Sequence, residues 1–344
     1  MIKIESLTML YKNGRGVNNI EISVEDGEVK GLLGPNGVGK STIFNLITGL
    51  IKPAYGSILF NGTDATEYPI YERTQKFKIG FCPQYGGFFS DLTLYENLKC
   101  VGEVLIIDER KRNEKINQLI AKFELESVRN IKAKLLSGGQ RKKCVIALAL
   151  LGEPQILLLD EPFSSVDAEL RESLALDVRS ILKELNVTSI LVTHDQNEAF
   201  MVADDIGVMN NGHIEQWANA YNIYHKPETR FVADFVGLGV FVKGISEGGN
   251  IKTPVGIFKL PKSIKAGSQK EVELLIRPDD VIHNDFSKLS AIVEEKHFRG
   301  AEFLYKLKCH GVPLLCYAPS HHDHKIGEPI GIDIDLEHLV IFQN

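Results

Sequence analysis

Apolar positions follow two different patterns along the chain. In the first two thirds, short apolar runs such as Val29 to Leu33, Ile156 to Leu159 and Ser189 to Val192 have the length of strands. A run with few polar interruptions fits a parallel strand that is covered on both faces. Apolar-rich stretches of helical length, such as Arg141 to Leu151, lie between these runs. The pattern predicts an α/β domain at residues 1–235.

A helical insertion is predicted from Ser90 to about Lys134. Its apolar residues recur at helical spacing with charged residues between them. They are Leu94, Leu98, Val101, Leu105, Ile116, Leu119, Ile120 and Phe123. Together with the helix that follows, this insertion predicts a helical subdomain at about residues 90–150.

From about Val236 the pattern changes to short strands separated by Gly, Pro, Asn or Asp. The predicted strands are Val255 to Leu260, Glu271 to Arg277, Leu289 to Lys296, Glu302 to Lys308, Val312 to Tyr317 and Pro329 to Ile334. This pattern predicts a second, all-β domain at residues 236–344, a small antiparallel barrel of the oligonucleotide/oligosaccharide-binding (OB) type. Two domains also fit a chain of 344 residues.

Composition narrows the function classes. The formal net charge is −6, and apolar and charged residues make up 44% and 24% of the chain, as in average globular proteins. We expect no nucleic-acid partner, because no basic, aromatic-studded face is evident. The longest apolar run, Cys144 to Leu151, is far shorter than the ~20 residues that span a bilayer. With no signal-peptide pattern and no CxxC pair among five cysteines, we expect a soluble intracellular protein.

A glycine-rich loop after the first apolar run predicts nucleotide binding. The segment Gly34-Pro35-Asn36-Gly37-Val38-Gly39-Lys40-Ser41-Thr42 has the spacing of a phosphate-binding loop. Its backbone N–H groups and the following helix N-terminus would face phosphate oxygens. Lys40 would contact the outer phosphates, and the Ser41 hydroxyl would help to hold Mg²⁺. We therefore expect Gly34, Asn36, Gly37, Gly39, Lys40, Ser41 and Thr42 to bind the phosphates of a nucleotide; the loop alone does not distinguish a kinase, a GTPase or a motor ATPase.

A second anion-binding motif precedes the helix at Arg141 to Leu151. Leu136-Ser137-Gly138-Gly139-Gln140 combines a serine, two glycines and a helix N-terminus. This motif resembles the signature of the ATP-binding cassette (ABC) ATPases. The resemblance implies a head-to-tail dimer, in which Ser137, Gly138, Gly139 and Gln140 of one copy close over the ATP that is held by Lys40 of a second copy.

Two carboxylates end the apolar run at Ile156 to Leu159. The segment that contains them, Asp160-Glu161-Pro162, resembles the Walker B motif of the ABC family. The resemblance implies that Asp160 binds Mg²⁺ and that Glu161 is the general base for the attacking water. Ser164-Ser165-Val166-Asp167 resembles the family's D-loop. This resemblance implies that Asp167 contacts nucleotide at the dimer interface.

Three further residues resemble functional positions of the family. Gln84, after Phe81-Cys82-Pro83, matches the Q-loop glutamine that contacts Mg²⁺ and water, and His194 matches the histidine that contacts the γ-phosphate. We expect both to join Glu161 in catalysis. Tyr11 lies where the family places an aromatic that stacks on adenine, although a tyrosine there is commonly a packing residue.

The C-terminal part resembles the TOBE regulatory domain of importer ATPases. Phe231 to Gly237, Leu275 to Val281 and Arg299-Gly300 carry this resemblance. It implies integral membrane permease subunits as partners, indirectly a solute-binding protein, and a location at the cytoplasmic face of the membrane. Tyr85 to Phe89 would line the groove for the permease. The junction is most similar to ferric-ion importers, with polyamine, thiamine and sulfate importers as alternatives; an ABC exporter or a soluble ABC ATPase remains open.

One histidine tract falls outside these motifs. His321-His322-Asp323-His324 offers imidazoles and a carboxylate that could bind a divalent cation. A polar loop between two strands explains the same residues, and we favour that interpretation at this stage.

Overall fold

The computed structural model describes residues 1–164, 166–260 and 270–343. The chain forms two compact units, Met1–Ala220 and Tyr221–Asn344. None of the helices in the described ranges is long and apolar enough to cross a bilayer.

A six-stranded sheet in the order β10-β9-β3-β8-β7-β6 forms the centre of the first unit. Its strands are β3 (Val29–Leu33), β6 (Ile79–Cys82), β7 (Ile156–Asp160), β8 (Thr188–Thr193), β9 (Asp205–Asn210) and β10 (His213–Ala218). Strands β6, β7, β8, β3 and β9 run parallel, and β10 pairs antiparallel with β9. Because parallel strands end at the same edge, the loops that follow β3, β6, β7 and β8 lie along one edge of the sheet.

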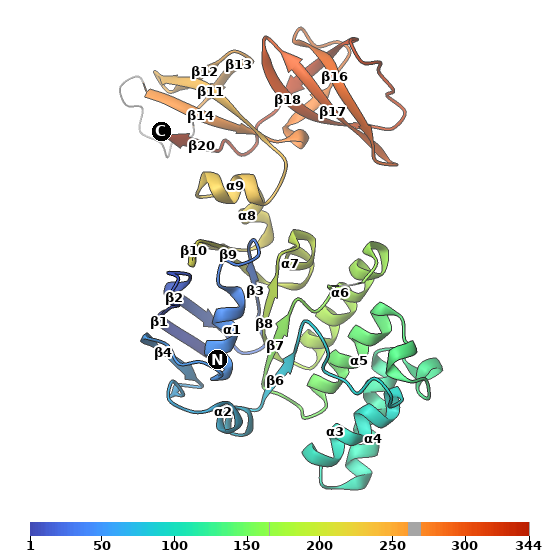
Figure 1. The fold of residues 1–344 in the computed structure, drawn as a ribbon. Coiled ribbons are helices and arrows are strands. Elements are labelled where there is room, and N and C mark those ends of the chain that lie inside the picture. Colours follow the sequence, from blue (N-terminus) through green and yellow to red (C-terminus); the bar gives the residue numbers. More distant parts are fainter. Residues whose placement is uncertain (165, 261–269, 344) are drawn as a thin grey trace. The chain divides into compact units, whose positions relative to one another are not determined.

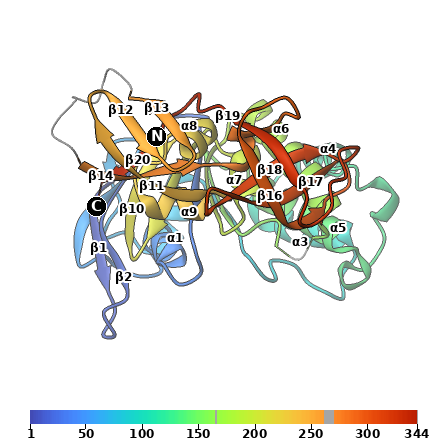
Figure 2. The same cartoon turned by 90° about the horizontal axis from the view of Figure 1, so that it is seen from above.

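An antiparallel sheet in the order β2-β1-β4-β5 adjoins it, and the β1–β2 hairpin is visible in Figure 2. These strands are β1 (Ile2–Leu10), β2 (Gly16–Val24), β4 (Tyr55–Phe60) and β5 (Thr63–Asp64). The helices of the unit are α1 (Lys40–Thr48), α2 (Ile70–Phe77), α3 (Leu94–Leu105), α4 (Glu109–Lys122), α5 (Gly138–Leu150), α6 (Ala168–Glu184) and α7 (Gln196–Val202), with 3₁₀ turns η1 (Glu126–Val128) and η2 (Ala133–Leu135).

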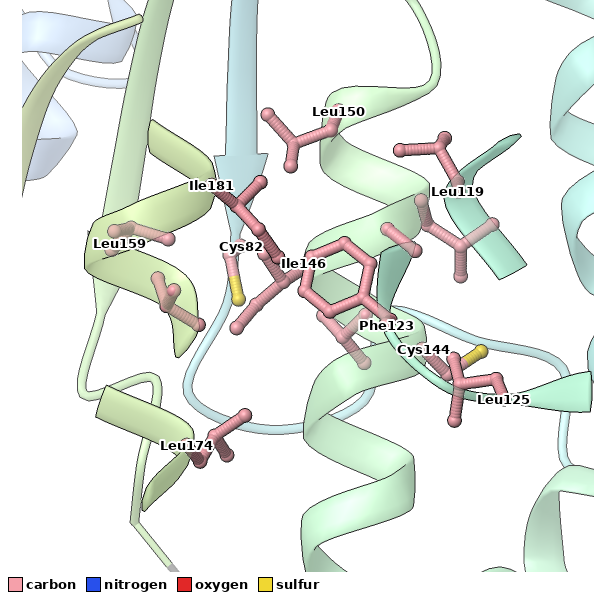
Figure 3. Close-up of a cluster of buried hydrophobic side chains, with 14 of the residues drawn as sticks. Cys82, Leu119, Phe123, Leu125, Cys144, Ile146, Leu150, Leu159, Leu174 and Ile181 are labelled. Carbon is pink, nitrogen blue, oxygen red and sulfur yellow. The ribbon is translucent and has the colours of Figure 1, made fainter. Parts of the chain in front are cut away.

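Two hydrophobic clusters cover the two faces of the central sheet. Leu157 and Leu159 of β7 pack with apolar residues of α3, α4, α5 and α6. Ile156 and Leu158, the alternate positions of the same strand, pack with α1, β1 and β2. Figure 1 shows α3 to α6 on one side of β6 to β8 and α1 on the other, and Figure 3 shows the first cluster. Since strand side chains alternate between faces, α1 and α5 lie on opposite faces of the sheet.

The second unit begins with two short helices, α8 (Ala220–His225) and α9 (Arg230–Phe235), and its remaining described elements are strands apart from the 3₁₀ turn η3 (Pro278–Asp280). One sheet has the order β13-β12-β11-β14-β20 and the other β15-β19-β16-β17-β18, and both are antiparallel. The strands are β11 (Val240–Glu247), β12 (Asn250–Thr253), β13 (Gly256–Lys259), β14 (Lys270–Ile276), β15 (Val281–His283), β16 (Ser290–Phe298), β17 (Glu302–Cys309), β18 (Val312–Pro319), β19 (Pro329–Ile334) and β20 (Ile341–Gln343).

Most predicted elements are confirmed. The predicted strand Pro329 to Ile334 matches β19 at both ends, and the helical insertion contains α3 and α4. The helix predicted after the glycine-rich loop is α1, which begins at Lys40 and ends at Thr48. It ends there because Gly49 takes a left-handed conformation, with φ of 81°, and caps the helix.

Candidate functional site

The predicted functional residues follow four neighbouring strands of the central sheet. Gln84 follows β6, Glu161 follows β7, His194 follows β8, and the glycine-rich loop follows β3. The register pairs Asp160 with Val192 across β7 and β8. The parallel arrangement therefore brings together residues that are far apart in the sequence.

The glycine-rich loop leads directly into α1 and contains a buried lysine. Lys40 Nζ donates hydrogen bonds to the carbonyl oxygens of Gly34 (2.6 Å) and Pro35 (2.8 Å), so its ammonium group lies over its own loop. Burial lowers the pKa of Lys40. Ser41 is exposed in the first turn of α1, and Asn36 and Gly37 are exposed at the tip of the loop. Such a loop can hold an anion between the helix N-terminus and the lysine.

An open pocket of about 680 Å³ lies beside this loop. Asn36 and Gly37 line it from the loop, and Leu10 and Arg15 line it from the β1–β2 hairpin. Tyr11 belongs to the same hairpin and its side chain is partly exposed, but it does not contribute to the lining. Its stacking on adenine stays a prediction.

Glu161 is held at the end of β7 by two of the predicted residues. Gln84 Nε2 donates to Glu161 Oε2 (2.6 Å), and His194 Nδ1 lies 3.1 Å from Glu161 Oε1. The Glu161 backbone is in the left-handed region, with φ of 43°, and its N–H donates to the Val192 carbonyl on β8 (2.9 Å). The side chain of Glu161 is 12% exposed and that of His194 is 49% exposed. A carboxylate in this position can accept a proton from a water molecule at the sheet edge.

Asp160 and its neighbours offer oxygen atoms of the kind that Mg²⁺ prefers. Burial, and then the charge of Glu161, raise the pKa of Asp160. A cation close to this carboxylate would offset both effects. The Asp160 carboxylate, the Ser41 hydroxyl and the Gln84 amide oxygen are hard donors, so these residue types fit Mg²⁺.

Lys142 is a site residue that the sequence reasoning missed. It lies on α5 and is largely buried, and its ammonium group donates to the carbonyl oxygen of Gln84 (2.8 Å). It also lies 3.3 Å from Ser164 Oγ and 3.4 Å from the carbonyl oxygen of Glu161. Lys142 therefore ties together the loops that carry Gln84 and Glu161. The sequence does contain a signal for this role, because Lys142 is a lysine within an otherwise buried helical stretch.

The serine-glycine motif forms the start of α5. Gln140 N donates to Ser137 Oγ (3.2 Å), and Ser137 N donates to Gln140 Oε1 (3.0 Å), which is a capping box. Gly138 and Gly139 form the first turn, where backbone N–H groups have no helical acceptor. This second anion cradle belongs to a helix on the opposite face of the sheet from α1.

Asp167 lies at the start of α6, where it is the N-cap residue without a side-chain cap hydrogen bond. Val166 is buried behind it, and Ser165 of the same predicted loop lies outside the described residues. A contact between Asp167 and nucleotide stays a prediction.

Comparison with known proteins places both units in recognised families. Residues 17–164 match the family described as ABC transporter, and residues 274–342 match the TOBE domain. The chain is 31% identical over 317 residues to an Fe(3+) ions import ATP-binding protein of Escherichia coli, which covers 91% of this chain and 89% of the relative. It is 40% identical over 236 residues to a sulfate/thiosulfate import ATP-binding protein of Synechocystis, covering 69% and 65%.

Solved structures agree with the sequence comparison. The CbiO1 subunit from Clostridium perfringens, part of an ABC transporter complex, is similar with a TM-score of 0.61 and 28% identity, covering 66% of this chain and 91% of that one. The dimeric ATP-binding cassette MJ0796, bound to ADP and phosphate, is similar with a TM-score of 0.56 and 29% identity, covering 64% and 99%. From its motifs, its fold and these relatives, the chain belongs to the ATP-binding subunits of ABC transporters.

Proposed function

We propose that this chain is the ATP-hydrolysing subunit of a membrane import complex. The observation that carries the proposal is the position of Gln84 and His194 on the two carboxylate oxygens of Glu161, whose charge also acts on the buried Lys40. The curated relatives are import ATP-binding subunits for ferric ions, sulfate or polyamines. The TOBE match favours an importer over an exporter or a soluble ABC ATPase.

Glu161 holds and deprotonates the attacking water in the proposed reaction. Lys40 and the N–H groups of the loop at Gly34, Gly37 and Gly39 hold the phosphates of ATP, and His194 contacts the γ-phosphate. Asp160, Ser41 and Gln84 would hold Mg²⁺, which would supply positive charge to neutralise the phosphates. The arrangement needs no covalent intermediate, because positioning and charge supply most of the catalysis in phosphoryl transfer.

A second copy of the chain completes each site in this proposal. The two anion cradles start helices that pack on opposite faces of one sheet, so they do not surround one nucleotide within a single chain. Ser137 Oγ accepts a cap hydrogen bond and keeps its own O–H to donate to an anion. A head-to-tail pair would place Ser137 and Gly139 of one copy over the ATP of the other.

The permease subunits of the complex bind the segment Tyr85 to Phe89 in this proposal. Tyr85 and Phe89 are 75% and 55% exposed, whereas Phe88 packs against the helical core cluster. Exposed aromatics directly after Gln84 couple the membrane partner to the catalytic glutamine. The chain would lie at the cytoplasmic face of the membrane through these subunits, and ferric ion is one of several candidate solutes.

Copurification tests the partner and the docking segment together. A tagged chain is purified from detergent-solubilised membranes of its own cells, and we expect multi-span membrane proteins to accompany it in fixed stoichiometry. The double change Tyr85→Ala and Phe89→Ala should reduce their recovery severalfold, because it removes apolar contact area. Tyr55→Ala is the matched control, since Tyr55 is equally exposed on β4. Recovery of the chain without membrane proteins would contradict the proposal.

A further inference from the structure

Three histidines from two separate segments converge in the second unit. His283 ends β15, and His322 and His324 lie in the loop after β18. One ligand nitrogen of each lies within 4.8 Å of the others, and His283 Nε2 is 3.1 Å from His324 Nε2. His321, which belongs to the same tract, is not part of this group. The fold thus selects two histidines of the tract and adds one from a distant strand.

The spacing of the ring nitrogens suits a metal ion. Donors about 2.0–2.1 Å from a tetrahedral ion lie about 3.3 Å apart, close to the separation between His283 and His324. Asp285 Oδ1 lies 3.0 Å from His283 Nε2, but among the described residues the group whose donor atoms all lie within 4.8 Å of one another consists of the three histidines. Three imidazoles form a donor set typical of zinc and its neighbours, whereas Mg²⁺ and Ca²⁺ prefer oxygen ligands.

Hydrogen bonds with a buried tyrosine fix the loop that carries His322 and His324. The hydroxyl of Tyr305, a fully buried residue, donates to the carbonyl oxygen of His322 (2.6 Å) and accepts from the backbone N–H of His324 (3.1 Å). These two hydrogen bonds hold the loop in one conformation without a bound ion. A preorganised loop lowers the entropy that is lost when a ligand binds.

A carboxylate also faces the second ring nitrogen of His324, Nδ1. Glu328 Oε1 lies 3.7 Å from His324 Nδ1, and Glu328 Oε2 accepts from the backbone N–H of Lys325 (2.7 Å). A carboxylate that faces the second ring nitrogen is the usual support of a metal-bound histidine, because it fixes the ring and its tautomer. His324 therefore directs Nε2 toward His283 while Nδ1 faces Glu328.

We propose that His283, His322 and His324 form a site for a late first-row divalent transition metal ion such as Zn²⁺. The site is close to the surface, since the side chains of His283 and His324 are 7% and 18% exposed while that of the neighbouring Asp285 is 65% exposed. It uses residues of the second unit and nitrogen ligands, so it differs from the proposed Mg²⁺ site of the nucleotide in both place and chemistry. A metal bound here ties β15 to the loop after β18.

Calorimetry on the full-length chain tests the site. The protein is stripped with a chelator and titrated with ZnCl₂ in excess Mg²⁺, which occupies oxygen sites and leaves the imidazoles free. We expect one zinc ion per chain, and a visible absorption band of nitrogen-bound cobalt when Co²⁺ replaces zinc. His283→Ala and His322→Ala should each weaken zinc binding by about tenfold or more and remove the cobalt band.

Matched variants separate this site from adventitious binding. His297→Ala removes an exposed histidine of the neighbouring strand β16 and should leave zinc affinity unchanged. Circular dichroism checks that each variant folds, and His322→Ala gives the decisive test if His283→Ala does not fold. Equal zinc affinity in the native chain and in the histidine variants, or the absence of stoichiometric zinc binding, would overturn the proposal.

Discussion

Glu161 adopts a backbone conformation that is unfavourable for a residue with a side chain. A left-handed φ costs about 1–2 kcal/mol outside glycine, and such strain persists only where the surroundings compensate for it. Here the compensation comes from the hydrogen bond of its N–H to Val192 and from the contacts of its carboxylate with Gln84 and His194. The strain turns the carboxylate toward the residues that follow β6 and β8, which is where we propose the water to be activated.

Lys142 should affect catalysis without contacting nucleotide. Lys142→Met removes the donor to the partly buried Gln84 carbonyl oxygen, which costs about 1–3 kcal/mol of folding free energy, whereas the Glu161 carbonyl oxygen keeps its hydrogen bond from Ser164 Oγ. We expect ATP turnover to fall about tenfold or more while ATP affinity stays within about threefold, because Lys40 and the glycine-rich loop are intact. Steady-state kinetics and chemical unfolding measure the two effects.

The neighbouring lysine is the control for this prediction. Lys143 is also on α5 but pairs with Asp177 (3.1 Å), away from Gln84 and Glu161. Lys143→Met should leave turnover nearly unchanged. If both variants behaved alike, Lys142 would have no special role at the site.

The glycine-rich loop depends on close packing against the β1–β2 hairpin. Gly39 has φ of 111°, and a Cβ there would lie 2.6 Å from Val17 Cγ1 and 2.8 Å from the carbonyl oxygen of Gly16. The second contact is with backbone, so the loop itself must shift. The conformation of the glycine-rich loop thus depends on the β1–β2 hairpin as much as on the loop itself.

Gly39→Ala should therefore displace the loop and weaken nucleotide binding. We expect ATP affinity to fall about tenfold or more, because the N–H groups no longer converge on the phosphates. Gly62→Ala is the control: its φ of 76° brings similar backbone strain, but no atom lies within 4 Å of the added Cβ. Binding of a fluorescent ATP analogue compares the two. Unchanged affinity in Gly39→Ala would show that the loop tolerates the shift.

Elements with clear apolar patterns were predictable, and those defined by tertiary pairing were not. The apolar strand Val29 to Leu33 is β3 as predicted. Strands β11 and β12 were not predicted, because Lys243, Gly244 and Lys252 interrupt their pattern; they form because β11 pairs along its length with β14. A strand that relies on a partner has little signal of its own.

The same limit applies to the functional residues. The resemblance to ABC-family motifs was enough to predict a joint role for Gln84, Glu161 and His194, and the structure brings them together because each follows a strand of one parallel sheet. It was not enough to find Lys142, whose role depends on how α5 packs. The histidine tract at 321–324 was noticed and interpreted as a polar loop, because His283 joins it only through the pairing of β15 with β19.

At the scale of the whole molecule, the location of the two anion cradles determines how the protein can work. The cradle of α1 packs into one hydrophobic cluster and that of α5 into the other, across a shared sheet. We propose that neither is complete until a second copy approaches. Bound ATP then lies between the two chains and holds them together, and the two chains separate when ATP is hydrolysed at Glu161.

The most direct test of this account is the oligomeric state of Glu161→Gln with and without ATP. The amide cannot accept the proton of water, so hydrolysis should be nearly abolished while ATP still binds. We predict a dimer in Mg-ATP and a monomer in ADP or without nucleotide, measured by analytical ultracentrifugation. Glu103→Gln, an exposed change on α3, should turn ATP over normally. A Glu161→Gln protein that remains monomeric in saturating Mg-ATP, or that hydrolyses ATP at the native rate, would contradict the account.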